Sequence, residues 1–355
     1  MRGALCCALA VLVLGVVAGP RSLSGDQTGP PIPMAILGDS DSHSYQAFPP
    51  EARGGVAFRA VTLQWTEILE RLRSREVDLG AWGVWGTRRR YALLRRVVRL
   101  ETRYPMKEDF RNNMALSGAR CEDLTSGLSR QVSPLLGILR REPEAWSRGI
   151  VVIRIGINSM GRADQLDQYA ETGLDAAARS SVDDCMEHIS STIRSVRSVS
   201  PNVKLALVGV AEDPNGAGNA DRWRSPTALS RIRQVLDYFD ERLTALAAFD
   251  PAAVFVEDRA WWVERFGGRD GAGSLAPKSV SLGGPTSVTN SVGDHPTHAV
   301  TADGHAGTVT NGLWLNHLVS RLNQRFGLGL TPLSDGEIAY LVDPVGALGI
   351  APTGP

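Results

Sequence analysis

The sequence predicts an α/β protein, a three-layer α/β/α sandwich with a central parallel sheet. Two observations lead to this class. Compact apolar runs rich in β-branched residues recur along the chain, and amphipathic helical patterns separate them. Such runs suit strands that are buried on both faces, and an alternation of strand and helix needs crossover connections that cover both faces of the sheet.

Four segments read as strands of this sheet. The run "RGIVVIRIGIN" at 148–158 shows the pattern well, because its Ile and Val residues are continuous and Gly149 and Gly156 bound them. The run "PIPMAILGDS" is the first strand, and it ends in a polar turn. The strands are expected in residues 31–40, 148–158, 202–212 and 252–258.

Four further segments read as helices. In residues 180–199, Val182, Met186 and Ile189 recur three and four positions apart, as on one face of a helix. Another helix should start with Pro226 at its first position, and the last should stop at Gly327. The helices are expected in residues 61–74, 180–199, 225–249 and 308–327.

Length and composition describe an ordinary globular chain. It has 355 residues, of which 43% are hydrophobic and 21% charged, and 38 basic residues balance 38 acidic ones. A net charge of zero gives no support for nucleic acid or an anionic membrane as the main partner. We expect one domain over residues 26–340 and a tail at 341–355, with the oligomeric state left open.

The first 25 residues read as a signal peptide. Arg2 provides the positive start, residues 4–18 are apolar, and the small residues Ala18 and Gly19 precede a polar stretch. This predicts a secreted or periplasmic protein, and an uncleaved N-terminal anchor is the alternative. No other stretch is long and apolar enough to span a membrane, so no span is expected in the mature chain.

The cysteines leave one question open. Cys6 and Cys7 lie within the expected signal peptide, so Cys121 and Cys185 remain in the mature chain. An exported protein folds in an oxidising compartment, which permits a disulfide between them. Two separate buried thiols are the alternative.

Three segments read as surface features. Residues 78–90 are rich in Gly and Trp, and residues 267–300 in Gly, Ser, Thr and Pro, so both are expected to be loops. Seven arginines lie between 88 and 103, which we interpret as a solvated helix face, with a polyanion site as the alternative. Tryptophans at 82, 85, 261 and 262 are expected to pack in the core, although stacking on a sugar ring is open.

Four polar stretches fall where ligands bind in parallel sheets, beyond the carboxyl ends of strands. Ser40 ends the first strand, Asn158 follows the 148–158 strand, Gly118 lies in "NNMALSGAR", and His305 precedes the last helix. A hydrolytic serine needs a base, a group that orients the base, and donors for the oxyanion. Ser40 offers the nucleophile and His305 the base, and Asp303 is the nearest carboxylate. The N–H groups of Ser40 and Gly118 and the Asn158 amide offer the donors.

With these four stretches, the chain resembles the SGNH hydrolases, also called the GDSL esterase and lipase superfamily. The matches are "GDS" with Ser40, "NMALSGA" with Gly118, "GIN" with Asn158 and "DGH" with His305, in the family's order and across most of the chain. The resemblance implies a flavodoxin-like fold and acyl-ester hydrolysis. It implies Ser40 as nucleophile, His305 as base, and an oxyanion hole of Ser40, Gly118 and Asn158.

The sequence departs from the family's pattern at two places. The family has Asp three residues before the histidine, whereas here Asp303 stands two before it, and Asp294 is a second candidate to orient the ring. The family commonly follows its asparagine with aspartate, and here Ser159 stands there. A loosened loop around Asn158 would be the consequence.

No cofactor or metal is expected. His295 and His298 are spaced like a metal pair, but no third ligand of matching spacing accompanies them. His43 reads as a solvated turn residue, and a place lining the pocket beside Ser40 is the alternative. The sequence therefore predicts an exported serine esterase for a small-molecule or glycan ester, with a short-chain or acetyl acyl group. The alternative is a non-catalytic exported glycan-binding protein that retains the fold.

Overall fold

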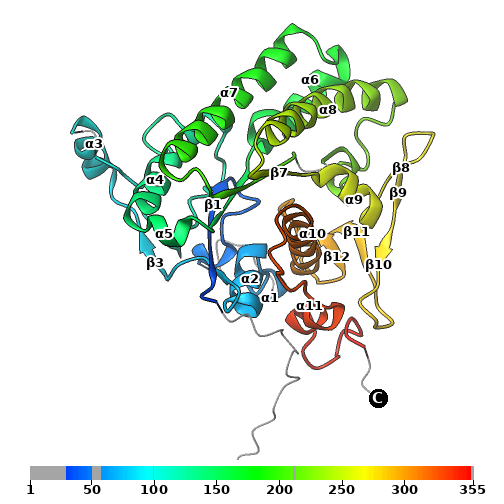
Figure 1. Ribbon diagram of the computed structural model, residues 1–355. Coiled ribbons are helices and arrows are strands. Elements are labelled where there is room, and N and C mark those ends of the chain that lie inside the picture. Colours follow the sequence, from blue (N-terminus) through cyan, green and yellow to red (C-terminus); the bar gives the residue numbers. More distant parts are fainter. Residues whose placement is uncertain (1–28, 50–56, 99, 211–212, 353–355) are drawn as a thin grey trace, which may run out of the picture.

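The computed structural model describes residues 29–49, 57–98, 100–210 and 213–352. Its centre is a five-stranded sheet in the order β2-β1-β5-β6-β7 (Figure 1), and every neighbouring pair is parallel. The strands are β1 (Ile32–Gly38), β2 (Val77–Asp78), β5 (Ile150–Arg154), β6 (Lys204–Val208) and β7 (Ala253–Val256). The predicted parallel sheet is therefore confirmed, and so is the class.

Helices cover both faces of this sheet, and each face has its own apolar core. Alternate residues of β1 point to opposite faces, so Ala35 and Leu37 lie in one core while Met34 and Ile36 lie in the other. The first core packs under α4 (Val132–Arg141), α5 (Pro143–Trp146), α6 (Ala163–Thr172), α7 (Ala176–Val199) and α8 (Pro226–Phe249). The second packs under α2 (Trp65–Arg73), α9 (Asp258–Phe266), α10 (Thr308–Phe326) and α11 (Asp335–Val342).

Two predicted helix ends match the structure, and one helix begins later than predicted. Pro226 is the first residue of α8, and Gly327 ends α10 in the left-handed conformation with φ 63°. The helix expected from residue 61 begins only at Trp65, because Gln64 caps it and its side chain accepts a hydrogen bond from the Trp65 N–H.

Both segments expected to be loops contain strands. Residues 78–90 include β3 (Trp82–Trp85), which pairs antiparallel with β4 (Lys107–Phe110). The helix α3 (Arg89–Val97) lies between these two strands in the sequence. Residues 267–300 hold β8 (Gly267–Arg269), β9 (Leu275–Pro277), β10 (Ser279–Val280), β11 (Val288–Val292) and β12 (His298–Val300). These expectations were wrong because strands of two to five residues among glycines show no clear alternation.

Other short elements complete the chain, namely α1 (Ala57–Ala60) and single helical turns at Tyr45–Ala47, Cys121–Leu124, Ile157–Gly161, Asp213–Asn215 and Ala217–Asn219. The expected signal peptide lies outside the described residues. Within the described ranges, no helix has the length and apolar character needed to cross a membrane. At the other end, Ile350 is buried, and the Asp343 carboxylate accepts hydrogen bonds from the N–H groups of Leu348 and Ile350.

Candidate active site

The turn that presents Ser40 is fixed at Gly38. The Gln131 side chain bonds both backbone groups of Gly38, with N···O distances of 2.7 Å each. A Cβ on Gly38 would lie 2.3 Å from the carbonyl oxygen of Arg154 on the paired strand, so only glycine fits. Ser40 follows, half-buried, and its carbonyl accepts a hydrogen bond from the Gln64 side chain at 3.3 Å.

Gly118 is brought to the same edge by backbone pairing with β1. Residues 112–116 run parallel to β1, since the Met114 N–H donates to Ile36 O and the Leu116 N–H donates to Gly38 O at 3.1 Å. Ser40 and Gly118 each lie two residues beyond that last pair. Gly118 has φ +79°, and a Cβ there would meet nothing within 4 Å. Its backbone is therefore open to solvent on this side.

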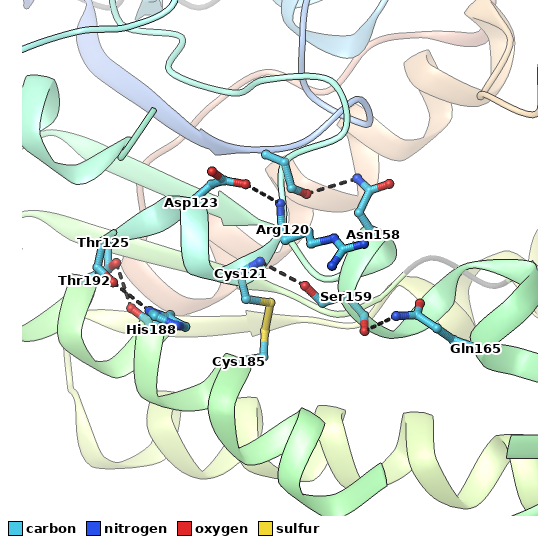
Figure 2. Close-up of a disulfide and its surroundings, with 11 residues drawn as sticks. Arg120, Cys121, Asp123, Thr125, Asn158, Ser159, Gln165, Cys185, His188 and Thr192 are labelled. Atoms are coloured by element: carbon cyan, nitrogen blue, oxygen red, sulfur yellow. Dashed lines mark hydrogen bonds between the residues drawn. A yellow bond between two sulfur atoms is a disulfide. The ribbon is translucent and has the colours of Figure 1, made fainter. Parts of the chain in front are cut away.

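Asn158 lies on a single π-turn (Ile157–Gly161) after β5, and Gly156 enters this turn with φ 140°. The Asn158 Nδ2 donates to the Ala119 carbonyl at 3.1 Å, which links this loop to the residue after Gly118. Figure 2 shows Asn158 and Ser159 beside Arg120 and Cys121. The Ser159 hydroxyl accepts a hydrogen bond from the Cys121 N–H at 3.0 Å, so the loop is held, contrary to the expected loosening.

A disulfide between Cys121 and Cys185 joins the same segment to α7 (Figure 2). The two Cα atoms are 5.0 Å apart, and 64 positions separate them in the sequence. The sequence left open a disulfide or two separate thiols, and the structure contains the disulfide.

Asp303 contacts the His305 ring. Its Oδ1 lies 3.1 Å from His305 Nδ1, and it also accepts a hydrogen bond from the Thr301 hydroxyl at 2.7 Å. The other Asp303 oxygen pairs with the buried Arg59 guanidinium. The second candidate, Asp294, instead accepts a hydrogen bond from the Ala302 N–H at 2.9 Å.

Two contacts fasten the His305 loop to the Ser40 turn. The Tyr45 hydroxyl donates to the Ala306 carbonyl at 2.9 Å, and the Tyr45 ring centre is 6.3 Å from that of His305. The second contact is indirect. The Leu63 N–H donates to the Thr308 hydroxyl, and the side chain of the next residue, Gln64, donates to the Ser40 carbonyl. The structure thus gathers Ser40, Gly118, Asn158 and His305 at the carboxyl edge of the sheet.

Charge near the turn alters proton affinities. Burial lowers the pKa of His305, but the hydrogen bond to Asp303 and the charges of Asp41 and Asp303 outweigh it and raise this pKa above its ordinary value. Partial burial raises the pKa of Asp303, but the hydrogen bonds from His305 and Thr301 outweigh it, so the carboxyl stays ionised. Burial raises the pKa of Asp39.

A buried cation lies beneath the turn, and sequence reasoning missed it. Arg154 ends β5, donates to the Asp41 carbonyl at 3.0 Å, and pairs with Asp258 at 2.9 Å. Its guanidinium stacks over the Trp314 ring with 3.9 Å to the centroid. A single arginine within the apolar run "VVIRIG" was the available signal, because a charge inside a buried strand needs a partner.

His43 is buried rather than solvated, which corrects the expectation. Its Nδ1 accepts a hydrogen bond from the Ser117 N–H at 3.1 Å, one residue before Gly118. Its Nε2 lies 3.9 Å from the carboxylate of Asp109, which itself is paired with Lys107 at 2.7 Å. Burial and the charges of Lys107 and Arg103 lower the His43 pKa to about 3, so the ring is neutral.

No group of three or more His, Cys, Asp or Glu side chains is arranged to hold a metal among the residues that the structure describes. His295 and His298 each contact a hydroxyl instead, from Thr297 and Ser291 at 2.8 and 2.7 Å.

Among known proteins, the matches to this chain are solved structures. No family model matches the chain, and no curated protein matches it. Its structure is similar to an extracellular lipase from Streptomyces rimosus, with 19% identity over 81% of this chain and 99% of that one and a TM-score of 0.37. A family 3 carbohydrate esterase from Clostridium thermocellum has 12% identity over 82% and 96%, with a TM-score of 0.34.

A third neighbour is a carbohydrate esterase whose active site displays divergent catalytic and non-catalytic binding functions. It has 12% identity over 88% of this chain and 69% of that one, and its TM-score is 0.39. These three neighbours are a lipase and two carbohydrate esterases, but likenesses this distant assign no activity to the chain. Its function has to be argued from its own residues.

Proposed function

We propose that this chain is an exported serine esterase of the SGNH type that hydrolyses short-chain or acetyl esters. The observation that carries the proposal is the Asp303–His305 contact of 3.1 Å on a loop tied to the turn of Ser40. The open backbone at Gly118, two residues beyond its pairing with β1, supports an oxyanion hole beside the nucleophile. The Cys121–Cys185 disulfide supports an oxidising compartment.

In the proposed mechanism, His305 takes the proton of Ser40 as its oxygen attacks the ester carbonyl. The N–H groups of Ser40 and Gly118 and the Asn158 amide stabilise the oxyanion. Asp303 holds the ring and stabilises the imidazolium that forms. His305 then protonates the leaving alcohol, and water repeats the sequence on the acyl-enzyme. No cofactor is needed.

The test is hydrolysis of p-nitrophenyl esters from acetate upward, together with covalent labelling by a fluorophosphonate probe. Wild-type protein should be active and labelled, and Ser40→Ala should lose both. A folded wild type that hydrolyses none of the esters and is not labelled at Ser40 would contradict the proposal and favour a non-catalytic binding protein.

A second experiment separates the two candidate orienting carboxylates. The raised pKa of His305 means that kcat/KM should rise with pH through a value above 6.5, because only the neutral ring is a base. Asp303→Asn should move this acidic limb to lower pH and lower kcat. Asp294→Asn is the matched control, since its carboxylate bonds the Ala302 N–H and should leave the limb in place.

A further inference from the structure

One segment gathers most of the large apolar side chains that the described residues expose. We define it as the arm, which comprises β3, α3 and the chain leading to β4, that is, the described residues 82–98 and 100–106. Nine of the fourteen such side chains lie in it. They are Trp82, Val84, Tyr91, Leu93, Leu94, Val97, Val98, Leu100 and Met106. Figure 1 shows α3 at the periphery of the molecule, away from the central sheet.

The helix of the arm exposes its large apolar side chains to solvent, whereas a helix that only covers a core buries them. Ala92 is its one buried residue. Residues in a helix are about 100° apart, so Leu93, Val97, Leu94 and Val98 span an arc of roughly 140° directly opposite Ala92. Their exposed fractions are 46%, 80%, 61% and 55%. The helix therefore rests on Ala92 and turns its apolar side to solvent.

The same surface is strongly cationic. Arg88, Arg89, Arg90, Arg95 and Arg96 are all exposed, and in the described part of the chain none of them has an ion-pair partner. The only acidic residue between 82 and 106 is Glu101, whose charge Arg140 and Arg141 already neutralise.

We propose that the arm docks on a bilayer surface containing anionic phospholipid, with α3 lying in the plane of the interface. The apolar arc would enter the boundary between headgroups and acyl chains. The arginines beside the arc, and Arg90 within it at the first turn of α3, would reach lipid phosphates. Tyr91, on α3 itself, suits the same depth, because an aromatic ring with one polar atom favours membrane interfaces.

Charge complementarity favours this occupant over two others. A second copy of the chain, docked through the same face about a two-fold axis, would set arginines against arginines, which repel. A nucleic acid or other anionic polymer would satisfy the arginines but leave the apolar arc in water. Of these three occupants, only an anionic lipid surface matches both features, and the inference holds whether or not Ser40 is a nucleophile.

The base of the arm is fixed independently of its exposed surface. Arg103 donates to the carbonyls of Arg111 and Asn113, and Lys107 pairs with buried Asp109. Substitutions on the exposed face of α3 therefore leave the attachment of the arm intact, and such variants should fold.

The experiment is sedimentation of the protein with vesicles of phosphatidylcholine alone or mixed with an equal part of phosphatidylglycerol. We expect binding to the anionic vesicles that weakens from 0.1 to 1 M salt, because the screening length falls from about 10 to 3 Å. Arg89→Gln/Arg90→Gln/Arg96→Gln should weaken it about fivefold per charge, or roughly 100-fold in all. Leu93→Ser/Val97→Ser should weaken it about tenfold or more.

Matched controls carry the same changes at exposed positions elsewhere. Arg71→Gln/Arg75→Gln/Arg233→Gln alters net charge equally, and Phe249→Ser removes a side chain that is 89% exposed. Both should bind as the parent does. The proposal is overturned if the parent shows no preference for anionic vesicles, or if the control and arm variants lose binding equally. Self-association or binding to heparin that depends on the arm, without vesicle binding, would also overturn it.

Discussion

His43 provides a direct test of how the loop before Gly118 is held. The change is His43→Asn, whose side-chain oxygen can accept the Ser117 N–H that Nδ1 accepts in the parent. Unlike imidazole, the amide does not take a proton. Above pH 6.5 both side chains are neutral, so the main loss in the variant should be the packing of the ring against Phe48, whose centre is 4.8 Å away.

The two proteins should separate as the pH falls. His43 has a pKa of about 3 in the folded chain and about 6.5 when unfolded. The unfolded state therefore binds more protons between these values, and the stability present above pH 6.5 is lost as pH falls through the window. Each pH unit is worth about 1.4 kcal/mol, so wild type should lose about 2 kcal/mol more than His43→Asn between pH 7 and pH 5.

The charges that face the ring do not reverse this sign. Asp109 lies 3.9 Å from Nε2, but Lys107 already neutralises it, and Arg103 adds further positive charge. Urea denaturation of both proteins at pH 7 and pH 5 measures the difference, and other titrating groups cancel between them. Parallel losses of stability in the two proteins would refute the account of a buried, neutral His43.

Three other substitutions are informative. Asn158→Ala should lower kcat of ester hydrolysis by about 10²–10³-fold with little change in unfolding, and an unchanged kcat would remove the amide from the oxyanion hole. Lys107→Met should cost about 3–5 kcal/mol in urea denaturation because it leaves the buried Asp109 without its ion-pair partner, and adding Asp109→Asn should recover part of that loss. Cys121→Ser/Cys185→Ser should cost about 4 kcal/mol, since the bond closes a long loop, and reduction of the parent should match it.

The sequence predicted the sheet and its covering helices because their cause is local. A strand buried on both faces must be continuously apolar, as "IVVIR" of β5 is, and a helix over a core must repeat its apolar residues every three or four positions, as α7 does. The short strands of residues 267–300 have no such signature. Their pairing depends on contacts that only the folded chain brings together.

Only the site residues at the ends of the predicted strands and helices could be placed from the sequence. Ser40, Asn158 and His305 follow strands or precede a helix, so their common edge follows from the topology. The partners beneath them come from distant segments. Nothing in the sequence pairs Gln131 with Gly38 or His43 with Ser117, because 93 and 74 positions separate them.

The arm and the candidate active site share one set of buried contacts. Lys107, the residue after the arm, donates both to Asp109 and to the carbonyl of Ala115, three residues before Gly118. Arg103 of the arm bonds the carbonyl of Asn113 in the same segment. Two cations at the base of the arm therefore connect it to residues 113–115, the segment that leads to Gly118.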